Sequence, residues 1–488
     1  MKLHEIEFKR RFSVNYYRNK KLMLGEMSFF RDWVNDNRGD PYTEISSDKS
    51  IKETIADGKY SLVATADGVK TRLIGEYFPY ANYELELEAF TGGKVGVLVS
   101  SPIGELTVYL TKTAVEITCA SGEKETFPAK WNKGDALCVN FQSQGLTVYL
   151  KKGDIYKRVG VLKAKMIPAL RDEKLFRSTK VFLTASLPKK KSVVFTSVKY
   201  YLDGGLSQAD MKPVRYEDGT PIVENGKIFL SMTTRNEVGG FQSMWSWNYT
   251  TCEFNLEGAL FFDAGDGLWC GDVAASVIYD RTSSTWRIWM CSFSHNHVLA
   301  RGTSISDPRF GINVIDVELL PVMPDDGDRT QFAGFSGDED PDLILVDGKW
   351  HLTICRLFPE SKGYHYCHFV SDNPFDGFTF VDKTPGTQKT GGLFIPTDEG
   401  IVFACGSDFN KRAIYDVYPI DDFTDCKNLR CDYDDGGFRG WGTVMMLPLG
   451  SRYQYVWITF DRHNAYEHNN WSYGNLYVFV SDTFKLDK

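Results

Sequence analysis

The stretch that decides the fold is Asp340-Pro-Asp-Leu-Ile-Leu-Val-Asp347-Gly348-Lys-Trp-His-Leu-Thr-Ile-Cys-Arg356. An acidic residue opens an apolar run, Asp-Gly follows, and a second apolar run ends in a basic residue. Asp-Gly between two apolar runs is typical of a two-residue β-hairpin turn, in which both turn residues adopt positive φ. Because the hairpin brings the start of the first strand beside the end of the second, the leading acid and the trailing Arg share one edge.

The same hairpin recurs along the second half of the chain. Its leading positions are separated by 62, 68, 51 and 51 residues, and the last two copies lack the acid. Repeats of this length that carry a few strands each are typical of propeller blades, so the sequence predicts a five-bladed β-propeller. The five hairpins open at Asp210, Asp272, Asp340, Gly391 and Gly442. The acid-led copies end in Arg235, His295 and Arg356.

The first half of the chain has a different spacing of strands and turns. Residues 55–202 alternate short strands with tight turns, and the run 83–90 places Tyr83, Leu85 and Leu87 on one face and three Glu on the other. This pattern predicts an antiparallel β-sandwich, which resembles the concanavalin-like (laminin G-like) jelly rolls of carbohydrate-active enzymes. We therefore expect an all-β protein with a sandwich at 1–203 and a propeller at 204–488. The sandwich either buttresses the propeller, which we favour, or binds sugar.

Composition excludes several classes of function. The net charge is −8 and no basic stripe is present, which argues against a nucleic-acid partner. The one compact basic run, Lys189-Lys190-Lys191, is interpreted as a solvated loop. No segment suits a signal peptide or a membrane span, so a cytoplasmic location and no membrane partner are expected. The ten cysteines form no CxxC pair, which indicates buried free thiols.

The acid-led strands resemble a known group of enzymes. Gln208-Ala-Asp210-Met-Lys-Pro, Gly271-Asp272-Val-Ala-Ala and Glu339-Asp340-Pro-Asp342 are similar to the motifs of the five-bladed β-propeller glycoside hydrolases of family 43 and its relatives in families 32, 62, 117 and 130. The resemblance spans about 285 residues. It implies an exo-acting, inverting hydrolase of small oligosaccharides.

The resemblance also implies roles for the acids. Asp210 corresponds to the general base, Asp272 to the residue that modulates pKa, and either Asp340 or Glu339 to the general acid. Family 43 supplies a Glu as the acid, whereas the residue in register here is Asp340. In a regular strand Glu339 would face the opposite side. Asp218, in the first turn, is the rival to Asp210 and is disfavoured because its spacing to the turn differs.

Inverting glycoside hydrolysis requires particular protonation states and spacing of two carboxyl groups. Inversion needs one ionised carboxylate to activate water and one protonated carboxyl to donate to the leaving oxygen, about 6.5–9.5 Å apart. Crowding several acids raises at least one pKa through burial and like-charge repulsion. Three acids in one register satisfy both demands, although a single Asp at a strand start would more often cap a turn.

Further residues are candidates for substrate binding. Arginine forks suit an acidic sugar or phosphate, although each Arg could equally serve as a counter-ion to a pocket Asp. No metal is expected, because His295-Asn-His297 lacks a third ligand; a structural calcium ion is the alternative, although Asp432–Gly436 lacks the closing Glu of an EF-hand loop. The binding candidates are Arg235, His295, Arg356, Arg462, His463, Trp269 and Trp441.

Other functions remain open at this stage. A glycoside phosphorylase would use the same acids with phosphate in place of water, and a non-catalytic propeller would only bind oligosaccharide. A polysaccharide lyase is disfavoured, because the sequence offers no clear Tyr/His pair beside the acids.

Overall fold

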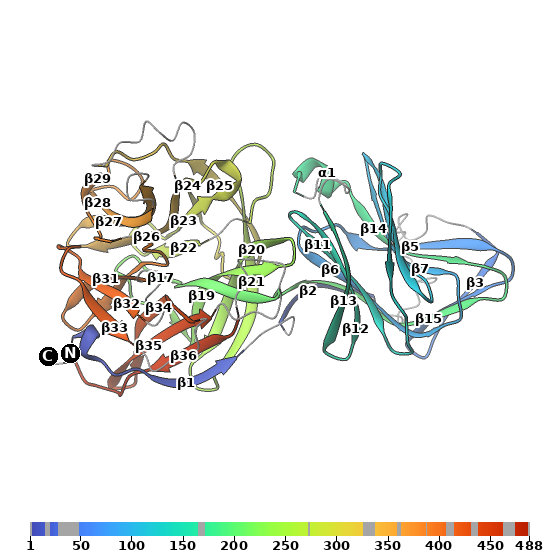
Figure 1. Ribbon diagram of the computed structural model, residues 1–488, viewed down its shortest axis with the longest axis horizontal. Coiled ribbons are helices and arrows are strands. Elements are labelled where there is room, and N and C mark those ends of the chain that lie inside the picture. Colours follow the sequence, from blue (N-terminus) through green and yellow to red (C-terminus); the bar gives the residue numbers. More distant parts are fainter. Residues whose placement is uncertain are drawn as a thin grey trace. The chain divides into compact units, whose positions relative to one another are not determined.

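The structure is a computed structural model. It describes residues 2–14, 20–27, 48–163, 171–271, 274–325, 337–358, 363–386, 388–406, 414–430, 438–461 and 474–486. The chain divides into two units, and both are built from strands (Figure 1). The first unit comprises 1–20, 204–235 and 240–488, and the second comprises 21–203 and 236–239.

The first unit is a five-bladed β-propeller. The innermost strand of each blade contacts the innermost strands of its neighbours, so that β16, β22, β26, β30 and β34 close a ring. Blade I contains β16 (Ser207–Pro213), β19 (Lys227–Asn236), β20 (Gly239–Asn248) and β21 (Glu253–Asp263), and blade II contains β22 (Ser276–Asp280), β23 (Thr285–Ser292), β24 (Val298–Ser304) and β25 (Gly311–Leu319). Blade III contains β26 (Asp338–Val346), β27 (Lys349–Phe358), β28 (Gly363–Ser371) and β29 (Thr379–Lys383). Blade IV contains β30 (Leu393–Thr397), β31 (Gly400–Gly406), β32 (Ile414–Pro419) and β33 (Lys427–Arg430), and blade V contains β34 (Phe438–Leu449), β35 (Arg452–Asp461), β36 (Leu476–Val480) and β1 (Lys9–Val14).

The repeated hairpin forms as the sequence predicts. Asp347 and Gly348 both have positive φ, 51° and 79°, which the tight turn between β26 and β27 requires. Apolar side chains then pack between neighbouring blades; Trp289, Leu343 and Leu352, for example, meet in the cluster between blades II and III. Two short strands add to these blades: β18 (Val223–Glu224) pairs with β19 of blade I, and β17 (Arg215–Tyr216) pairs parallel with β22 of blade II.

The N-terminal residues lie in the propeller. Residues 1–20, which the sequence analysis assigned to the sandwich, group with the propeller unit. The reason is that β1 pairs antiparallel with β36 and so supplies the fourth strand of blade V. A strand from the other end of the chain thus covers the edge of the last blade.

The second unit is an antiparallel β-sandwich of a six-stranded and an eight-stranded sheet. The six-stranded sheet contains β5 (Gly68–Glu76), β7 (Lys94–Ser101), β8 (Gly104–Leu110), β9 (Ala114–Thr118), β10 (Lys124–Pro128) and β14 (Lys180–Leu187). The eight-stranded sheet contains β2 (Lys21–Met27), β3 (Ile51–Ala56), β4 (Lys59–Ala64), β6 (Ala81–Phe90), β11 (Ala136–Gln142), β12 (Gly145–Lys152), β13 (Ile155–Lys163) and β15 (Ser192–Asp203). The helix α1 (Glu173–Arg177) precedes β14, and the short helix expected at 29–34 lies outside the described residues.

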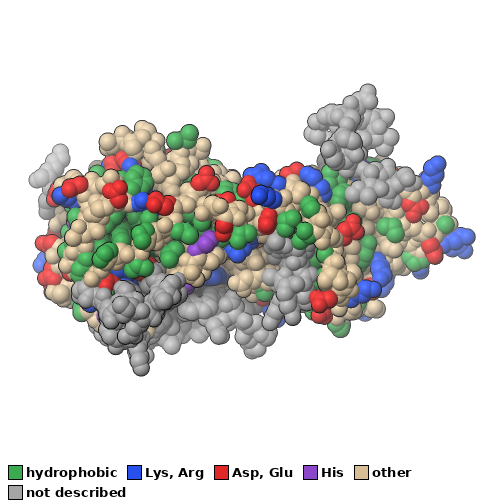
Figure 2. All heavy atoms as spheres, turned by 90° about the horizontal axis from the view of Figure 1, so that it is seen from above, with side chains coloured by type: hydrophobic (Ala, Val, Ile, Leu, Met, Phe, Trp, Pro, Cys, Tyr) green, Lys and Arg blue, Asp and Glu red, His purple; other side chains and the backbone are tan. Residues whose placement is uncertain are grey.

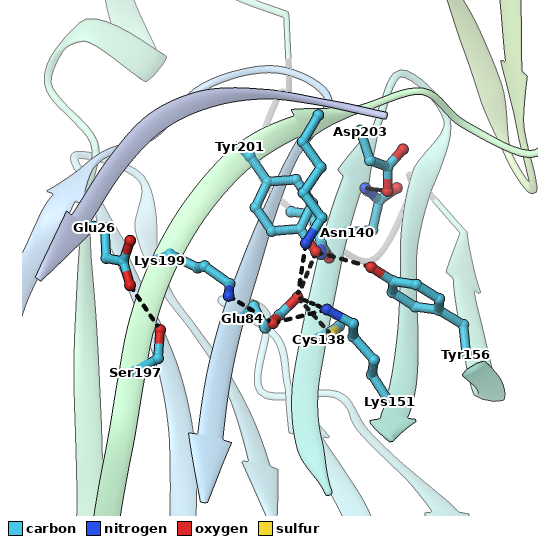
Figure 3. Close-up of polar contacts among 12 residues, drawn as sticks. Glu26, Glu84, Cys138, Asn140, Lys151, Tyr156, Ser197, Lys199, Tyr201 and Asp203 are labelled. Atoms are coloured by element: carbon cyan, nitrogen blue, oxygen red, sulfur yellow. Dashed lines mark hydrogen bonds and ion pairs between the residues drawn. The ribbon is translucent and has the colours of Figure 1, made fainter. Parts of the chain in front are cut away.

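Strand β6 shows how the sandwich combines an apolar and a polar face. Tyr83, Leu85 and Leu87 are fully buried in the core, as the alternation predicts. On the other face Glu84 is also buried. Its carboxylate forms an ion pair with Lys151 at 3.0 Å and accepts a hydrogen bond from the Tyr201 hydroxyl at 2.6 Å (Figure 3). Burial raises the pKa of Glu84, but the Tyr201 hydrogen bond and the surrounding lysines outweigh it and lower the pKa to about 2.

The described cysteines are mostly buried, and the described surface mixes charged and hydrophobic side chains. The nine cysteines that the structure describes are free, and seven of them are buried. On the face shown in Figure 2, acidic and basic side chains are interspersed with hydrophobic ones. Within the described ranges, no helix is long and apolar enough to cross a bilayer.

Candidate active site

Two of the predicted acids occupy matching irregularities at the starts of innermost strands. The register of β16 against β19 shifts between Ala209 and Lys212, and that of β26 against β27 shifts between Glu339 and Asp342. Inside these bulges Asp210 and Asp340 have positive φ, 50° and 47°. Asp tolerates this conformation better than most residues, and a bulge redirects the side chains beside it.

The bulges bring Asp210 and Asp340 to one cavity. Both line a space of about 10 Å³ at the propeller axis, together with Gly391, Gly392 and other residues of the innermost strands. The backbone N–H of Gly391 donates to Oδ2 of Asp340 at 3.0 Å. Asp340 is buried and Asp210 is half-buried, so one end of this pair is open to solvent. The structure therefore groups two acids that are 130 residues apart in the sequence.

The third predicted acid, Asp272, lies outside the described residues. Blade II nevertheless shows which residue is in register. Ala274 has a positive φ of 61° and lies two residues before Ser276, the first residue of β22 to pair with β23. Asp340 lies likewise two residues before Asp342, where pairing resumes. The residue that corresponds to Asp340 in blade II is thus Ala274, two positions after the predicted one.

Glu339 is the carboxyl with the most unusual environment. Its side chain is 19% exposed, and Oε1 accepts a hydrogen bond from the Tyr364 hydroxyl at 3.0 Å. Nδ1 of His297 lies 3.3 Å from the same oxygen. Burial and the negative charge of Asp340 raise the pKa of Glu339 to about 8, with smaller contributions from Asp210 and Asp338. This raised pKa favours the protonated form of Glu339 at neutral pH.

The sequence analysis missed the partners of Glu339. Tyr364 is the second residue of β28, two strands away from β26, and its pKa is raised by burial and by Glu339. His297 has a positive φ of 56°, its carbonyl accepts from the Asp338 N–H at 3.1 Å, and its ring packs edge-on against Phe293. The sequence suggested His297 only as a metal ligand. The sequence signal for Tyr364 was the regular succession of strands within a blade, which places the start of the third strand at the same edge as the start of the first.

Buried cations lie beneath the acids. The ammonium of Lys212 donates to the Pro341 carbonyl at 2.6 Å, and burial lowers its pKa although Asp342 and Asp340 oppose that shift. Arg215 pairs with Asp342 at 2.6 Å and donates to the Phe394 carbonyl. These groups tie the innermost strands of blades I, III and IV together. A Lys inside the apolar strand after Asp210 was the sequence signal for this network.

The predicted binding residues fall into different places. Arg356 is completely buried and pairs with Asp338 and Asp325, both at 2.6 Å, so it is a structural counter-ion. Trp269 is 5% exposed and stacks on Phe261 in the core, and hence forms no open wall. The side chain of Trp441 and the residues Arg462 and His463 lie outside the described part of the structure.

Two of the predicted binding residues remain near the surface. Arg235 is half-buried and pairs with Ser207 at the start of β16. His295 is held between the Ser292 hydroxyl at 2.6 Å and the Asp266 carboxylate at 3.0 Å. Within the ranges that the structure describes, no group of three or more His, Cys, Asp or Glu side chains is arranged to hold a metal ion.

The chain was compared with known protein families, curated proteins and solved structures. No protein-family model and no curated protein matches the chain. Among solved structures it is similar to a family 117 glycoside hydrolase from Zobellia galactanivorans (13% identity, 56% of this chain and 90% of that one, TM-score 0.36). It is also similar to the catalytic domain of a family 62 α-L-arabinofuranosidase from Coprinopsis cinerea (11%, 56% and 92%, TM-score 0.35) and to a family 43 β-1,3-galactosidase (12%, 55% and 93%, TM-score 0.35). At this level of likeness, the chemistry has to come from the side chains of the site.

Proposed function

We propose that the protein is a glycoside hydrolase, exo-acting on small oligosaccharides with inversion, in which Glu339 is the general acid. The observation that carries the proposal is the carboxyl of Glu339, whose pKa is raised to about 8 beside Asp210 and Asp340. Glycosidic cleavage needs one carboxyl kept protonated and one kept ionised, and environments that push pKa values apart supply both.

The acid step follows from the contacts of Glu339. Tyr364 and His297 both contact Oε1 of Glu339, which leaves Oε2 to carry the proton. In the reaction Oε2–H donates to the glycosidic oxygen as the bond from that oxygen to the anomeric carbon breaks. Glu339 becomes a carboxylate, which the Tyr364 hydroxyl stabilises by its hydrogen bond. Tyr364 and His297 are thus positioning residues for the acid.

The base step is assigned to Asp210. It is half-buried at a bulge that lines the same cavity as Asp340. As a carboxylate, Asp210 would accept a proton from the water that attacks the anomeric carbon, while the negative charge of Asp340 keeps Glu339 protonated. Asp272 is proposed as a modulator of pKa from its place two residues before Ala274, the position that corresponds to Asp340 in blade II. For substrate contacts we propose Arg235, His295, Trp441, Arg462 and His463.

A second candidate, a polysaccharide lyase, is favoured by one observation. The sequence offered no Tyr/His pair beside the acids, whereas Tyr364 and His297 both reach Glu339. Lyases remove a proton from the carbon next to a uronic carboxyl, and a Tyr can serve as the base. However, the raised pKa of Tyr364 opposes its ionisation, and its hydroxyl already donates to Glu339. Hydrolysis is the better fit.

The test is a panel of aryl glycosides and small oligosaccharides, each assayed with and without phosphate. The proposal expects phosphate-independent release of a terminal sugar, with an anomeric configuration opposite to that of the substrate in the first turnovers by NMR. Phosphate-dependent turnover would indicate a phosphorylase, and an unsaturated product absorbing in the ultraviolet would indicate a lyase. Binding without turnover by both the wild type and Asp210→Asn would indicate a non-catalytic propeller.

A further inference from the structure

A groove at one edge of the sandwich is lined by basic side chains. It measures about 600 Å³ and lies where the β8–β9 turn, the end of β10 and strand β13 meet. Its lining contains three lysines and no Asp or Glu. The complete lining is Lys112, Thr113, Pro128, Ala129, Lys130, Trp131 and Lys157.

The backbone frame of the groove is well defined. Ala114 pairs with Pro128 at the end of the β9–β10 ladder, and the Ala129 N–H donates to the Thr113 carbonyl at 2.9 Å. The Trp131 indole N–H donates to the Asp135 carbonyl at 3.2 Å, which fixes the next turn. These bonds hold the lysine-bearing segments in place, so a ligand would not have to order them first.

The three ammonium groups have no acidic partner among the described residues. All three lysines are exposed, and the ammonium of Lys112 lies 4.4 Å from the Trp131 ring centre. Other lysines of the sandwich form ion pairs with glutamates. Lys94 pairs with Glu116 at 2.5 Å, and Lys59 pairs with Glu88 at 2.7 Å. Three unneutralised cations on a protein of net charge −8 create a local positive potential that would attract an anion.

We propose that this groove binds an anionic polysaccharide, through carboxylate or sulfate groups spaced along the sugar chain. The Thr113 hydroxyl adds a hydrogen-bonding group suited to sugar hydroxyls. Single-stranded nucleic acid fits less well, because it requires aromatic faces on which bases stack, and the Trp131 ring is 9% exposed with Lys112 over it. The site is independent of the proposed active site in the propeller.

The experiment uses the full chain and measures binding by isothermal titration calorimetry. The probes are polygalacturonate, dextran sulfate, neutral dextran and a single-stranded oligonucleotide. The variant carries Lys112→Gln, Lys130→Gln and Lys157→Gln. The matched control carries Lys189→Gln, Lys190→Gln and Lys191→Gln, which remove the same charge from an exposed loop of the same unit. Melting temperatures of both triple variants establish that they fold.

The expected result is binding of at least one of the two anionic polysaccharides and none of neutral dextran. The groove variant should weaken that binding by about tenfold or more, whereas the loop control should change it by less than about twofold, and added salt should weaken it further. Preference for polygalacturonate would identify carboxylates as the ligand groups, and preference for dextran sulfate would identify sulfates. Equal weakening in both variants, tighter binding of the oligonucleotide, or no binding of either polysaccharide would overturn the proposal.

Discussion

The hydroxyl of Tyr364 donates a 3.0 Å hydrogen bond to Oε1 of Glu339, although the two residues lie on strands separated by β27. The bond crosses from β28 to β26 at the edge of blade III where the predicted acids lie. It connects the raised pKa of Glu339 to a residue that can be changed without removing the carboxyl.

Tyr364→Phe should move the alkaline limb of the kcat/KM profile to higher pH. The hydrogen bond from Tyr364 lowers the pKa of Glu339, so its loss raises that pKa further above its value of about 8. Because the protonated acid is the active form, activity should persist to higher pH, while kcat/KM near pH 6 falls by less than about tenfold. Tyr109→Phe, which removes a hydroxyl 3.1 Å from Thr184 in the sandwich, is the control and should leave the profile unchanged. If the alkaline limb of Tyr364→Phe stayed at the wild-type pH, that limb would not report the ionisation of Glu339.

Glu339→Gln should become more stable than the wild type as the pH rises. The unfolded chain releases the Glu339 proton near pH 4.3, whereas the folded protein holds it to about pH 8. Between these values the folded state binds more protons, so the free energy of unfolding of the wild type falls with rising pH. Gln does not ionise and loses no stability in this window. The difference in Tm between variant and wild type should therefore grow from pH 5 to pH 9, and a constant difference would contradict the raised pKa.

Asp210→Asn should reduce kcat by about 10²–10⁴-fold with Tm unchanged or raised, because it removes the proposed base and relieves repulsion among the acids. Asp272→Asn should also lower kcat. Asp218→Asn is the control: this residue is 44% exposed and pairs with Arg281 at 2.5 Å in the turn that follows β17. If Asp218→Asn lost activity and Asp210→Asn did not, the base would be misassigned.

The two described arginines should respond differently to replacement. Arg356→Leu leaves Asp338 and Asp325 buried without their cation and should destabilise the fold by about 3–5 kcal/mol in denaturant unfolding. Arg235→Lys should leave Tm nearly unchanged and lower kcat/KM, more strongly on a uronic substrate than on its neutral analogue, since Lys lacks the bidentate fork. An equal small loss on both substrates would make Arg235 a counter-ion as well.

Removing the sandwich should expose the contribution of β1. A 204–488 fragment lacks the strand that pairs with β36, and we expect low solubility and no activity. The Gly204 N–H donates to the Lys20 carbonyl at 2.6 Å, so a short Gly-Ser linker can join residues 1–20 directly to 204–488. That variant should melt at a higher temperature than the fragment. A soluble, active 204–488 fragment would show that β1 is dispensable.

Much of the fold could be predicted from local pattern. The Asp347-Gly348 turn, the alternation in Tyr83–Leu87 and the recurrence of the hairpin depend on nearby residues, and the structure confirms them. The closure of blade V by β1 could not be predicted, because strands from opposite ends of a chain leave no local signature. For the same reason the sequence analysis placed residues 1–20 in the sandwich.

The site was harder to predict than the fold. The sequence predicted Asp210 as the base and either Asp340 or Glu339 as the acid, with Glu339 facing away if β26 were a regular strand. The bulge at Asp340 breaks the alternation, and bulges depend on φ rather than on a residue pattern that distinguishes them. The partners Tyr364 and His297 come from another strand and another blade, so only the folded chain brings them to Glu339.

The most direct test of the central claim compares two glycosides of the same sugar in the wild type and in Glu339→Gln, with the sugar taken from the substrate panel. One has a leaving group that departs without a proton, such as 2,4-dinitrophenolate, and the other is an alkyl glycoside or disaccharide. If Glu339 is the general acid, the variant should lose about 10²–10⁴-fold in kcat/KM on the second substrate, keep most activity on the first, and lose the alkaline limb near pH 8. Equal losses on both substrates, with the alkaline limb retained, would contradict the assignment.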